Sequence, residues 1–330
     1  MGSELKRPAE SIAASERKEY EGDTWEWGDY TIAAMEKPRA IYQWQLRSRN
    51  LELGRRTLVM GILNITPDSF SDGGRFLSRD HAVGHALQML EEGADILDIG
   101  GESTRPGAKV VETGISAEEE LCRIMPVIED ALRERPDTVI SADTYKAGVA
   151  RAALNAGVEI VNDVSGLRWD AEMAKTLAQR KCGVILMHTR GRPEEWRDLP
   201  PSADIVAEVK DGLRELTVNA VQAGIGKERI MIDPGFGFGK KFEQNYPLLA
   251  GLDELAELGF PLLAGVSRKS FIGRTLARDG KDAPPEMRTY GTLAAVTMSV
   301  LKGAHLVRVH DVRQAVEAVK VADEILKVMI

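Results

Sequence analysis

The stretch "MGILNITPDSFSDGG" (residues 60–74) changes character at its fifth residue, and this change decides between two α/β folds. Residues 60–63 are apolar enough to cross a sheet, whereas residues 66–74 hold one Pro, two Asp, two Ser, two Gly and a single aromatic residue, Phe70. A dinucleotide-binding sheet requires Gly-x-Gly-x-x-Gly directly after its first strand. Here the first strand ends in Asn64 and a long polar loop, which argues against a Rossmann fold.

Short apolar runs recur beyond this first one, and amphipathic stretches separate them. The runs cover residues 57–64, 95–101, 138–143, 159–165, 183–188, 229–235, 261–267 and 305–311. The stretches 81–94 and 117–135 have the spacing of helices, and the second follows Ser116, a suitable N-cap. Eight strands alternating with helices over roughly 250 residues are typical of a (β/α)8 TIM barrel. The alternative is an open doubly wound sheet, but the glycines of "GFGFGK" (235–240) follow the sixth strand and suit a tight turn near a ligand.

The chain has 330 residues, of which 43% are hydrophobic, so it can bury a large core. Single α/β barrels reach this length, and we expect one barrel domain over residues 51–330. Residues 1–50 are polar and charged, with Trp25, Trp27 and Trp44 among them. We expect them to form an irregular N-terminal extension that is partly disordered and partly packed on the barrel.

The net charge of −8 and the pI near 5.4 argue against a nucleic-acid partner. No apolar run reaches the roughly 18 residues of a membrane helix, and the N-terminus lacks the apolar segment of a signal peptide. Cys122 and Cys182 have no partners at metal-binding spacing and make no disulfide framework. We therefore expect a cytoplasmic protein without membrane contact.

Polar residues stand at the end of every predicted strand, where a barrel builds its active site. They are Asn64, Asp98 with Glu102, Asp143, Asn162 with Asp163, His188, Asp233, Ser267 with Arg268 and Lys269, and Arg308 with His310. One Asp or Asn after a strand is as often a cap of a turn as a ligand contact. Eight together indicate a polar ligand held at many points.

One subset suits a flat heterocycle. It consists of Asp143, Asn162, Asp233 and Lys269. Carboxylate and amide oxygens can each accept hydrogen bonds from an amidine-like edge that presents N–H and NH2 donors. We therefore expect a heterocycle to bind these side chains.

A second subset suits a phosphate with a divalent ion. Asn64, Arg308 and His310 lie on neighbouring strands, because the eighth strand of a barrel closes onto the first. Arg308 and His310 share one face of their strand, and their donors beside an amide oxygen favour an anion. His310 alone could also be a buried structural histidine.

The loops after the strands add cations and hydroxyl groups. "GGESTRPGA" (100–108) carries Thr104, Arg105 and Pro106 between glycines, a composition typical of a lid. "SRKSFIG" (267–273) places Lys269 and Ser270 at a predicted helix start, where a carboxylate or phosphate can bind. An exposed basic turn is the alternative.

Eight motifs together resemble those of the dihydropteroate synthase family. They are "MGILNITPDSFSDGG" (60–74), "DIGGESTRPGA" (98–108), "SADTYKAGVA" (141–150), "IVNDVSG" (160–166), "MHTRG" (187–191), "DPGFGFGK" (233–240), "GVSRKSFIG" (265–273) and "RVHD" (308–311). The resemblance covers about residues 51–325, and the departures at Ala142 and Thr189 affect no catalytic position. It implies a barrel transferase of folate biosynthesis, a sulfonamide target, which joins 6-hydroxymethyl-7,8-dihydropterin diphosphate to p-aminobenzoate and releases diphosphate.

The resemblance also assigns roles to residues of this chain. It implies a pterin site of Asp143, Asn162, Met187, Asp233 and Lys269, a diphosphate site of Asn64, Thr104, Arg105, Arg308 and His310, and a p-aminobenzoate site of Phe70, Pro106, Phe238, Lys269 and Ser270. Mg²⁺ would bind near Asn64, and Asp72 would organise the closed loops. The catalytic set is then Asp143, Lys269, Arg308, His310, Asp72 and Arg105.

We expect a dissociative substitution, since the pterin ring can delocalise positive charge at its CH2 group. Such a path needs charge neutralisation on the leaving diphosphate and a carboxylate near the cation, for which we assign Asp143. Two rivals are a pterin-dependent methyltransferase domain serving a corrinoid partner and a non-catalytic pterin-binding relative. The motifs "TPDSFSDGG", "STRPGA" and "SRKS" and the retained Asn64, Arg308 and His310 favour the synthase over both. The family is usually dimeric, so we expect a homodimer through helices near 286–302 and 311–326.

Overall fold

A ring of parallel strands forms the centre of the protein. In this computed structural model the described residues are 39–65, 75–102 and 114–329, with only the backbone for 75–78. The strands of the eight-stranded sheet are β3 (Leu58–Asn64), β4 (Ile96–Gly100), β5 (Val139–Asp143), β6 (Ile160–Asp163), β7 (Gly183–Met187), β8 (Ile230–Asp233), β9 (Leu263–Ala264) and β10 (Leu306–Val309). Each of the eight predicted runs contains one of these strands.

The strands pair in the order β8-β7-β6-β5-β4-β3-β10-β9, and every pair is parallel. A parallel bridge between Ile232 of β8 and Leu262, directly before β9, joins the two ends of this order. The sheet therefore closes on itself, which confirms the barrel and excludes the open doubly wound sheet. The last strand β10 lies next to the first barrel strand β3, as a closed barrel requires.

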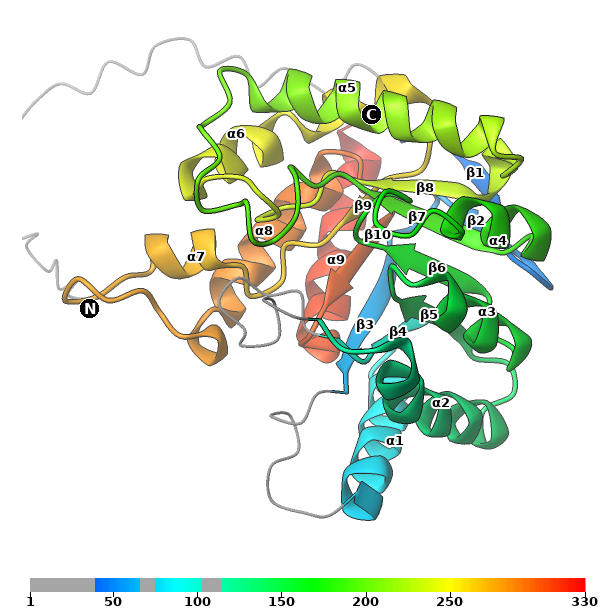
Figure 1. Ribbon diagram of the computed structural model, residues 1–330. Coiled ribbons are helices and arrows are strands. Elements are labelled where there is room, and N and C mark those ends of the chain that lie inside the picture. The colour runs from blue at the N-terminus through cyan, green and yellow to red at the C-terminus, as the bar shows by residue number, and fades with distance from the viewer. Residues whose placement is uncertain (1–38, 66–74, 103–113, 330) are drawn as a thin grey trace, which may run out of the picture. The chain divides into compact units, whose positions relative to one another are not determined.

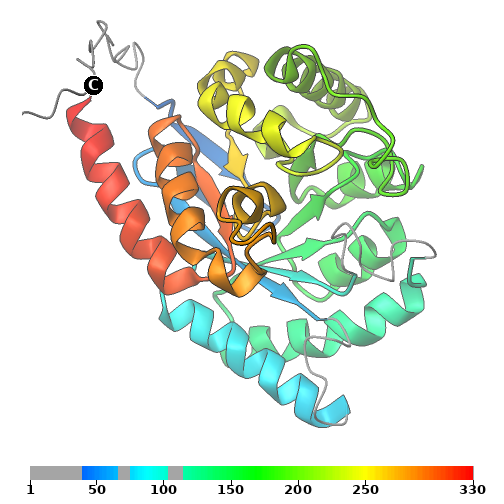
Figure 2. The same cartoon turned by 90° about the vertical axis from the view of Figure 1, so that its left-hand side faces the viewer.

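Helices surround the strands (Figures 1 and 2). They are α1 (Arg75–Glu91), α2 (Ala117–Glu134), α3 (Ala147–Asn155), α4 (Met173–Arg180), α5 (Ile205–Gln222), α6 (Asn245–Ala250), α7 (Ser270–Thr275), α8 (Thr289–Leu301) and α9 (Val312–Val328). Short 3-10 helices cover Lys227–Arg229, Phe242–Gln244, Leu252–Leu258 and Pro285–Met287. Ser116 caps α2 as expected, because its side chain accepts a hydrogen bond from the Glu119 backbone N–H at 3.1 Å.

Strand residues alternate between the barrel interior and the surrounding helices. The interior cluster at the start of the strands consists of Leu58, Met60, Ile96, Val139, Ile160, Ile185, Met231, Leu263 and Leu306. Residues one position further along, such as Val59, Leu97 and Val307, belong to the core between strands and helices. The same alternation places the polar residues of the next interior layer, described below.

An antiparallel hairpin of β1 (Tyr42–Gln45) and β2 (Asn50–Leu53) closes the N-terminal end of the barrel. Trp44 is 1% exposed, packs against the interior cluster and donates from Nε1 to the Arg229 carbonyl oxygen at 2.8 Å. The boundary expected at residue 50 falls at the start of β2. Of the predicted extension, residues 1–38 lie outside the described residues, so its domain assignment remains a prediction.

Candidate active site

A polar layer lies above the apolar interior cluster, toward the C-terminal ends of the strands. It lies two residues further along each strand and contains Asp98, Ser141, Asn162, Met187, Asp233 and Arg308. Asn64 and Asp143 end their strands one interior position beyond this layer. Strands hold these side chains in fixed relative positions, which suits a site that orients a rigid ligand.

The Arg308 network, formed by Arg308, Asp98, Asp143 and Asn162, joins strands from opposite sides of this layer. Arg308 Nε donates to Asp98 Oδ2 at 2.5 Å, and its Nη2 donates to Asp143 Oδ2 at 2.6 Å. Asn162 Nδ2 donates to the same Asp98 oxygen at 3.0 Å. The guanidinium expected at the diphosphate thus lies against Asp143, one of the carboxylates expected at the pterin.

Burial and charge act in opposite directions on this network. Burial raises the pKa of Asp143 to about 7, although Arg308 beside it favours the carboxylate. Burial by itself would lower the pKa of Arg308, but Asp98 and Asp143 raise it above its ordinary value. Arg308 therefore stays charged, while Asp143 can exchange a proton near neutral pH.

Two buried polar atoms at the bottom of this layer have no hydrogen-bond partner among the described residues: Asp98 Oδ1 and Ser141 Oγ. Asp98 and Ser141 face each other across β4 and β5. Burying such atoms without a partner is costly, so they are suited to bind a polar ligand group or a water molecule. The sequence placed Asp98 among the polar strand-end residues but in neither ligand subset, and it did not single out Ser141.

The turn after β8 is built around Asp233 and a buried lysine. Asp233 Oδ1 accepts from the Gly235 backbone N–H at 2.7 Å. Gly235 has a φ of +67°, and a Cβ there would lie 2.0 Å from the His188 carbonyl oxygen, so only glycine fits. Lys240 Nζ donates to the carbonyl oxygens of Gly235 at 2.8 Å and of His188 and Phe238 at 3.3 Å. Burial lowers the pKa of Lys240 to about 7.

This turn presents Phe238 to the rest of the site. The Lys269 ammonium lies 4.0 Å from the Phe238 ring centroid, and the Trp196 and Phe238 rings form a T-shaped pair with their centroids 5.4 Å apart. Burial raises the pKa of Asp233, while the nearby Lys269 charge opposes that rise. Lys269 thus connects a carboxylate of the polar layer with an aromatic wall, as its place in two predicted sites requires.

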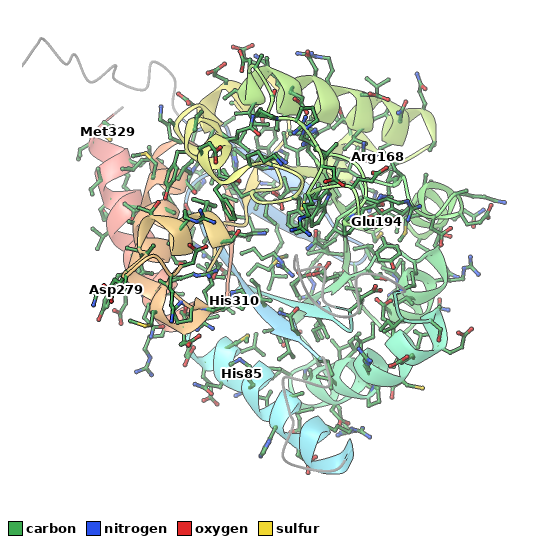
Figure 3. All side chains as sticks on the ribbon, turned by 60° about the vertical axis from the view of Figure 1, so that its left-hand side comes forward. His85, Arg168, Glu194, Asp279, His310 and Met329 are labelled. Atoms are coloured by element: carbon green, nitrogen blue, oxygen red, sulfur yellow. The ribbon has the colours of Figure 1, made fainter. Side chains whose placement is uncertain are left out.

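Neighbouring pairs connect the ends of β9 and β10. Ser267 Oγ lies 2.9 Å from His310 Nδ1 and accepts from the His310 backbone N–H at 3.1 Å. Arg268 forms an ion pair with Asp311 at 2.5 Å. His310, labelled in Figure 3, follows β10 directly and is half-buried. Arg268 was expected to serve the ligand as one of the strand-end cations, but it is bound to Asp311.

Two strand-end residues point away from the barrel interior and a third pairs with a lysine that precedes α3, contrary to the convergence that the sequence suggested. His188 packs against Gly212 of α5, Asp163 accepts from the backbone N–H groups of Ser165 and Leu167, and Glu102 pairs with Lys146. The alternation of strand side chains explains the first two, since Met187 and Asn162 occupy the interior positions. These residues stabilise loops and packing and do not line the polar layer.

The remaining predicted loop residues cannot be placed. Phe70 and Asp72 lie within residues 66–74, and Thr104, Arg105 and Pro106 lie within residues 103–113, both outside the described residues. Their roles remain predictions. Ser270 is described, and it begins the short helix α7 directly after Lys269.

The donor set near Asn64 suits a metal ion only if the ligand brings it. Among the described residues, no group of three or more His, Cys, Asp or Glu side chains could hold a metal. Asn64 offers one amide oxygen at the end of β3. Mg²⁺ commonly binds through one or two protein oxygens together with substrate phosphates, and this donor set fits that mode.

Known proteins are similar to this chain over most of its length. Residues 60–310 match the pterin binding enzyme family. The dihydropteroate synthase of Synechocystis sp. is 48% identical over 271 residues, which cover 82% of this chain and 90% of that protein. The Escherichia coli dihydropteroate synthase is 45% identical over 268 residues, which cover 81% and 91%.

Solved structures of the same enzyme are similar throughout the barrel. Xanthomonas albilineans dihydropteroate synthase with 4-aminobenzoic acid superposes with a TM-score of 0.78 at 45% identity, covering 87% of this chain and 98% of that one. The same organism's enzyme in complex with 7,8-dihydropteroate gives 0.72 at 43% identity, covering 83% and 95%. The Yersinia pestis enzyme with a sulfonamide drug gives 0.78 at 41% identity, covering 86% and 99%.

Proposed function

The chain belongs to the pterin binding enzyme family, and on that premise we propose how its barrel carries out the dihydropteroate synthase reaction. The activity is that of a folate-pathway transferase, which joins 6-hydroxymethyl-7,8-dihydropterin diphosphate to p-aminobenzoate and yields 7,8-dihydropteroate and diphosphate. The observation that carries the mechanism is the polar layer, in which carboxylates, an amide and two cations meet inside the barrel.

The pterin ring binds edge-on in the polar layer. Asp143, Asn162 and Asp233 accept from its N–H and NH2 groups, with Met187 as an apolar wall. The free oxygen of Asp98 and the Ser141 hydroxyl lie deeper and provide further polar contacts for the ring or for a bound water. A ligand there satisfies groups that are otherwise buried without partners, which supports this placement.

The p-aminobenzoate ring binds beside Phe238, at the end of the site that Lys269 reaches. Its carboxylate pairs with the Lys269 ammonium and the Ser270 hydroxyl. Lys269 is the N-cap of helix α7, and Ser270 is its first residue. Because Lys269 also acts on Asp233, one side chain contacts both substrate sites. This arrangement directs the amine of p-aminobenzoate toward the pterin CH2 group.

The substitution breaks the CH2–oxygen bond to diphosphate and forms a CH2–nitrogen bond. The bond electrons leave with the diphosphate, positive charge spreads into the pterin ring, and the amine nitrogen loses a proton after attack. The Asp143 carboxylate favours the cation, and Arg308 holds that carboxylate in place. Asn64 and His310 contact the diphosphate. Asn64 would hold Mg²⁺ together with the diphosphate, and the ion would supply charge neutralisation for the leaving group.

The test is diphosphate release with purified full-length protein and Mg²⁺. We expect release only when the pterin diphosphate and p-aminobenzoate are both present, with 7,8-dihydropteroate formed in equal amount. Asp143→Ala and Arg308→Ala should each reduce turnover greatly while the circular dichroism spectrum stays unchanged. Release no faster than with either substrate alone would refute the assignment, and near-normal turnover of a variant would refute the role of that residue.

We also propose a homodimer and a cytoplasmic location. Helices α8 and α9 pack together. Apolar side chains are exposed on both: Met298 on α8, and Val321, Ile325 and Val328 on α9. The α9 residues are spaced at i, i+4 and i+7 and so form one stripe, which supports this surface as the contact.

No described helix is both long and apolar enough to cross a membrane. Cys122 and Cys182 are free thiols, which supports a reducing compartment.

A further inference from the structure

Ser267 makes two contacts with His310, one with its backbone and one with its imidazole ring. A backbone N–H can only donate, so Ser267 Oγ accepts from the His310 backbone N–H at 3.1 Å. The same oxygen lies 2.9 Å from His310 Nδ1, within hydrogen-bond distance. The hydroxyl proton of Ser267 can then complete the pair by pointing at Nδ1.

The surroundings fix Ser267 in this position. Ser267 is 4% exposed, and the next residue, Arg268, has a φ of +53°, which is unusual for a residue other than glycine. The Arg268 backbone N–H donates to Thr292 Oγ1 at 2.9 Å, and the Arg268 carbonyl oxygen accepts from Arg288 Nη1 at 2.8 Å. Its side chain donates to both carboxylate oxygens of Asp311 at 2.5 and 3.1 Å. The strained turn is therefore held from both sides.

This bracing also fixes His310. Asp311 follows His310 directly and begins α9, so the Arg268–Asp311 ion pair holds the two chain segments at one separation. The ion pair is partly buried, with 28% and 16% of the two side chains exposed. It therefore keeps the backbone that carries Ser267 close to the backbone that carries His310. The Ser267–His310 contact is therefore a built feature of the resting protein.

We propose that Ser267 is a positioning residue that selects, for the neutral form of the His310 imidazole, the tautomer with its proton on Nε2. A neutral imidazole has one donor and one acceptor nitrogen, and a hydroxyl that donates to Nδ1 makes Nδ1 the acceptor. Nε2–H is then a hydrogen-bond donor toward the diphosphate. This role rests on the proposed function, because it gives His310 a donor for the leaving group without requiring a charged imidazolium.

The tautomer is measured directly by nitrogen-15 NMR on the full-length protein labelled in its histidines. The chain has five histidines, and the spectrum of His310→Gln identifies the signals of His310 by their loss. In the neutral form of His310 without ligand, which a pH series of spectra identifies, we expect an unprotonated Nδ1 and a protonated Nε2. A proton on Nδ1 would overturn the proposal. This readout needs no turnover, so it stands even if the proposed reaction fails its own assay.

Substitution of Ser267 separates positioning from folding. Ser267→Ala should convert His310 to a mixture of tautomers and lower kcat by about tenfold, the size expected for losing one oriented hydrogen bond of about 1.4 kcal/mol. Ser267→Thr keeps the hydroxyl group, so its His310 tautomer and its kcat should match those of the wild-type protein. Ser299→Ala removes another buried hydroxyl, which bonds within α8 at 2.7 Å, and should change neither tautomer nor kcat.

Inorganic diphosphate with Mg²⁺ tests the contact with the leaving group. In the wild-type protein its addition should shift the His310 Nε2 signal, and in Ser267→Ala the shift should be smaller. An unchanged Nε2 signal in the wild-type protein at saturating diphosphate would refute the donor role. A pure Nε2–H tautomer in Ser267→Ala would refute the role of Ser267.

Discussion

At the scale of single residues, Asp98 holds the polar layer together, a role that its place among the predicted strand-end residues did not reveal. It is fully buried and accepts from both Arg308 and Asn162. Removing one partner of a buried ion pair typically costs about 3–5 kcal/mol, because the other charge is left uncompensated. We expect Asp98→Ala to lose about that much unfolding free energy in urea and to lower kcat by misplacing Arg308. Asp253→Ala, in an exposed pair with Lys302, should lose about 1 kcal/mol or less. Equal losses would show that Asp98 is not paired as described.

The raised pKa of Asp143 predicts opposite pH effects on activity and on stability. Its pKa is about 7 in the folded protein and about 3.9 in an unfolded chain, so between these values the folded state binds the extra proton. Unfolding free energy from this group therefore falls as pH rises from about 4 to 7 and is constant above. Turnover should rise over pH 6–8, because the carboxylate is the active form.

Urea unfolding of the wild-type and Asp143→Asn proteins between pH 5 and 8 measures the effect on stability. The difference between the two proteins isolates Asp143 from other carboxyl groups. One of these is Asp163, whose pKa is raised by burial to about 6. A wild-type stability that rises with pH relative to Asp143→Asn would contradict the assignment.

At the scale of elements, the turn after β8 depends on Lys240, whose ammonium binds three carbonyl oxygens. We expect Lys240→Met to loosen this turn and displace Phe238, which raises the KM for p-aminobenzoate by about tenfold, equal to about 1.4 kcal/mol. The KM for the pterin diphosphate should change less. Lys241→Met is the matched control, because Lys241 donates to a carbonyl oxygen at the surface. Steady-state kinetics with each substrate varied in turn decide the matter, and equal increases in both KM values would contradict the prediction.

The sequence predicted the strands well and the direction of their side chains less well. Apolar runs located all eight barrel strands, because a strand buried on both faces needs consecutive apolar residues. The run 261–267 forms only the two-residue strand Leu263–Ala264, since the chain turns away toward the left-handed Arg268. His188 and Asp163 were expected at the site and face outward, because strand ends alternate in direction and register was not known.

Barrel closure predicted that Arg308 and Asn64 lie on neighbouring strands, but the sequence did not predict which side chains bind one another. The pairing of Arg308 with Asp98 and Asp143 joins residues separated by 210 and 165 positions, and only barrel closure brings them together. The same holds for Ser267 with His310. A family resemblance names ligand-binding residues, but it does not show which of them bind one another in the resting protein.

At the scale of the whole molecule, the proposed dimer depends on the exposed stripe of α9. Val321 is 62% exposed and Ile325 is 39% exposed. A carboxylate placed at the centre of an apolar contact would lose its water and find no partner. We therefore expect Val321→Glu to convert the dimer to a monomer, as measured by sedimentation. Val218→Glu, a similar change on the exposed face of α5, should leave the assembly intact. A monomeric wild-type protein would refute the proposal.

Residues at the N-terminal end of the barrel serve stability, and residues at the C-terminal end serve catalysis. Substitutions in the N-terminal hairpin test this separation. Trp44 fills the bottom of the barrel below the apolar interior cluster, at the end opposite the polar layer. Losing a buried Trp side chain costs about 3–5 kcal/mol through lost burial and the cavity left behind. We expect Trp44→Ala to lose this much unfolding free energy while kcat and both KM values stay within about twofold at temperatures where the variant is folded, as the separation of functions in barrels implies. Ile41→Ala, at a residue that is 53% exposed, should change the unfolding free energy by about 0.5 kcal/mol or less. A folded Trp44→Ala variant with greatly reduced kcat would show that the hairpin also shapes the polar layer, because the interior cluster would then transmit its packing to Asp98 and Arg308.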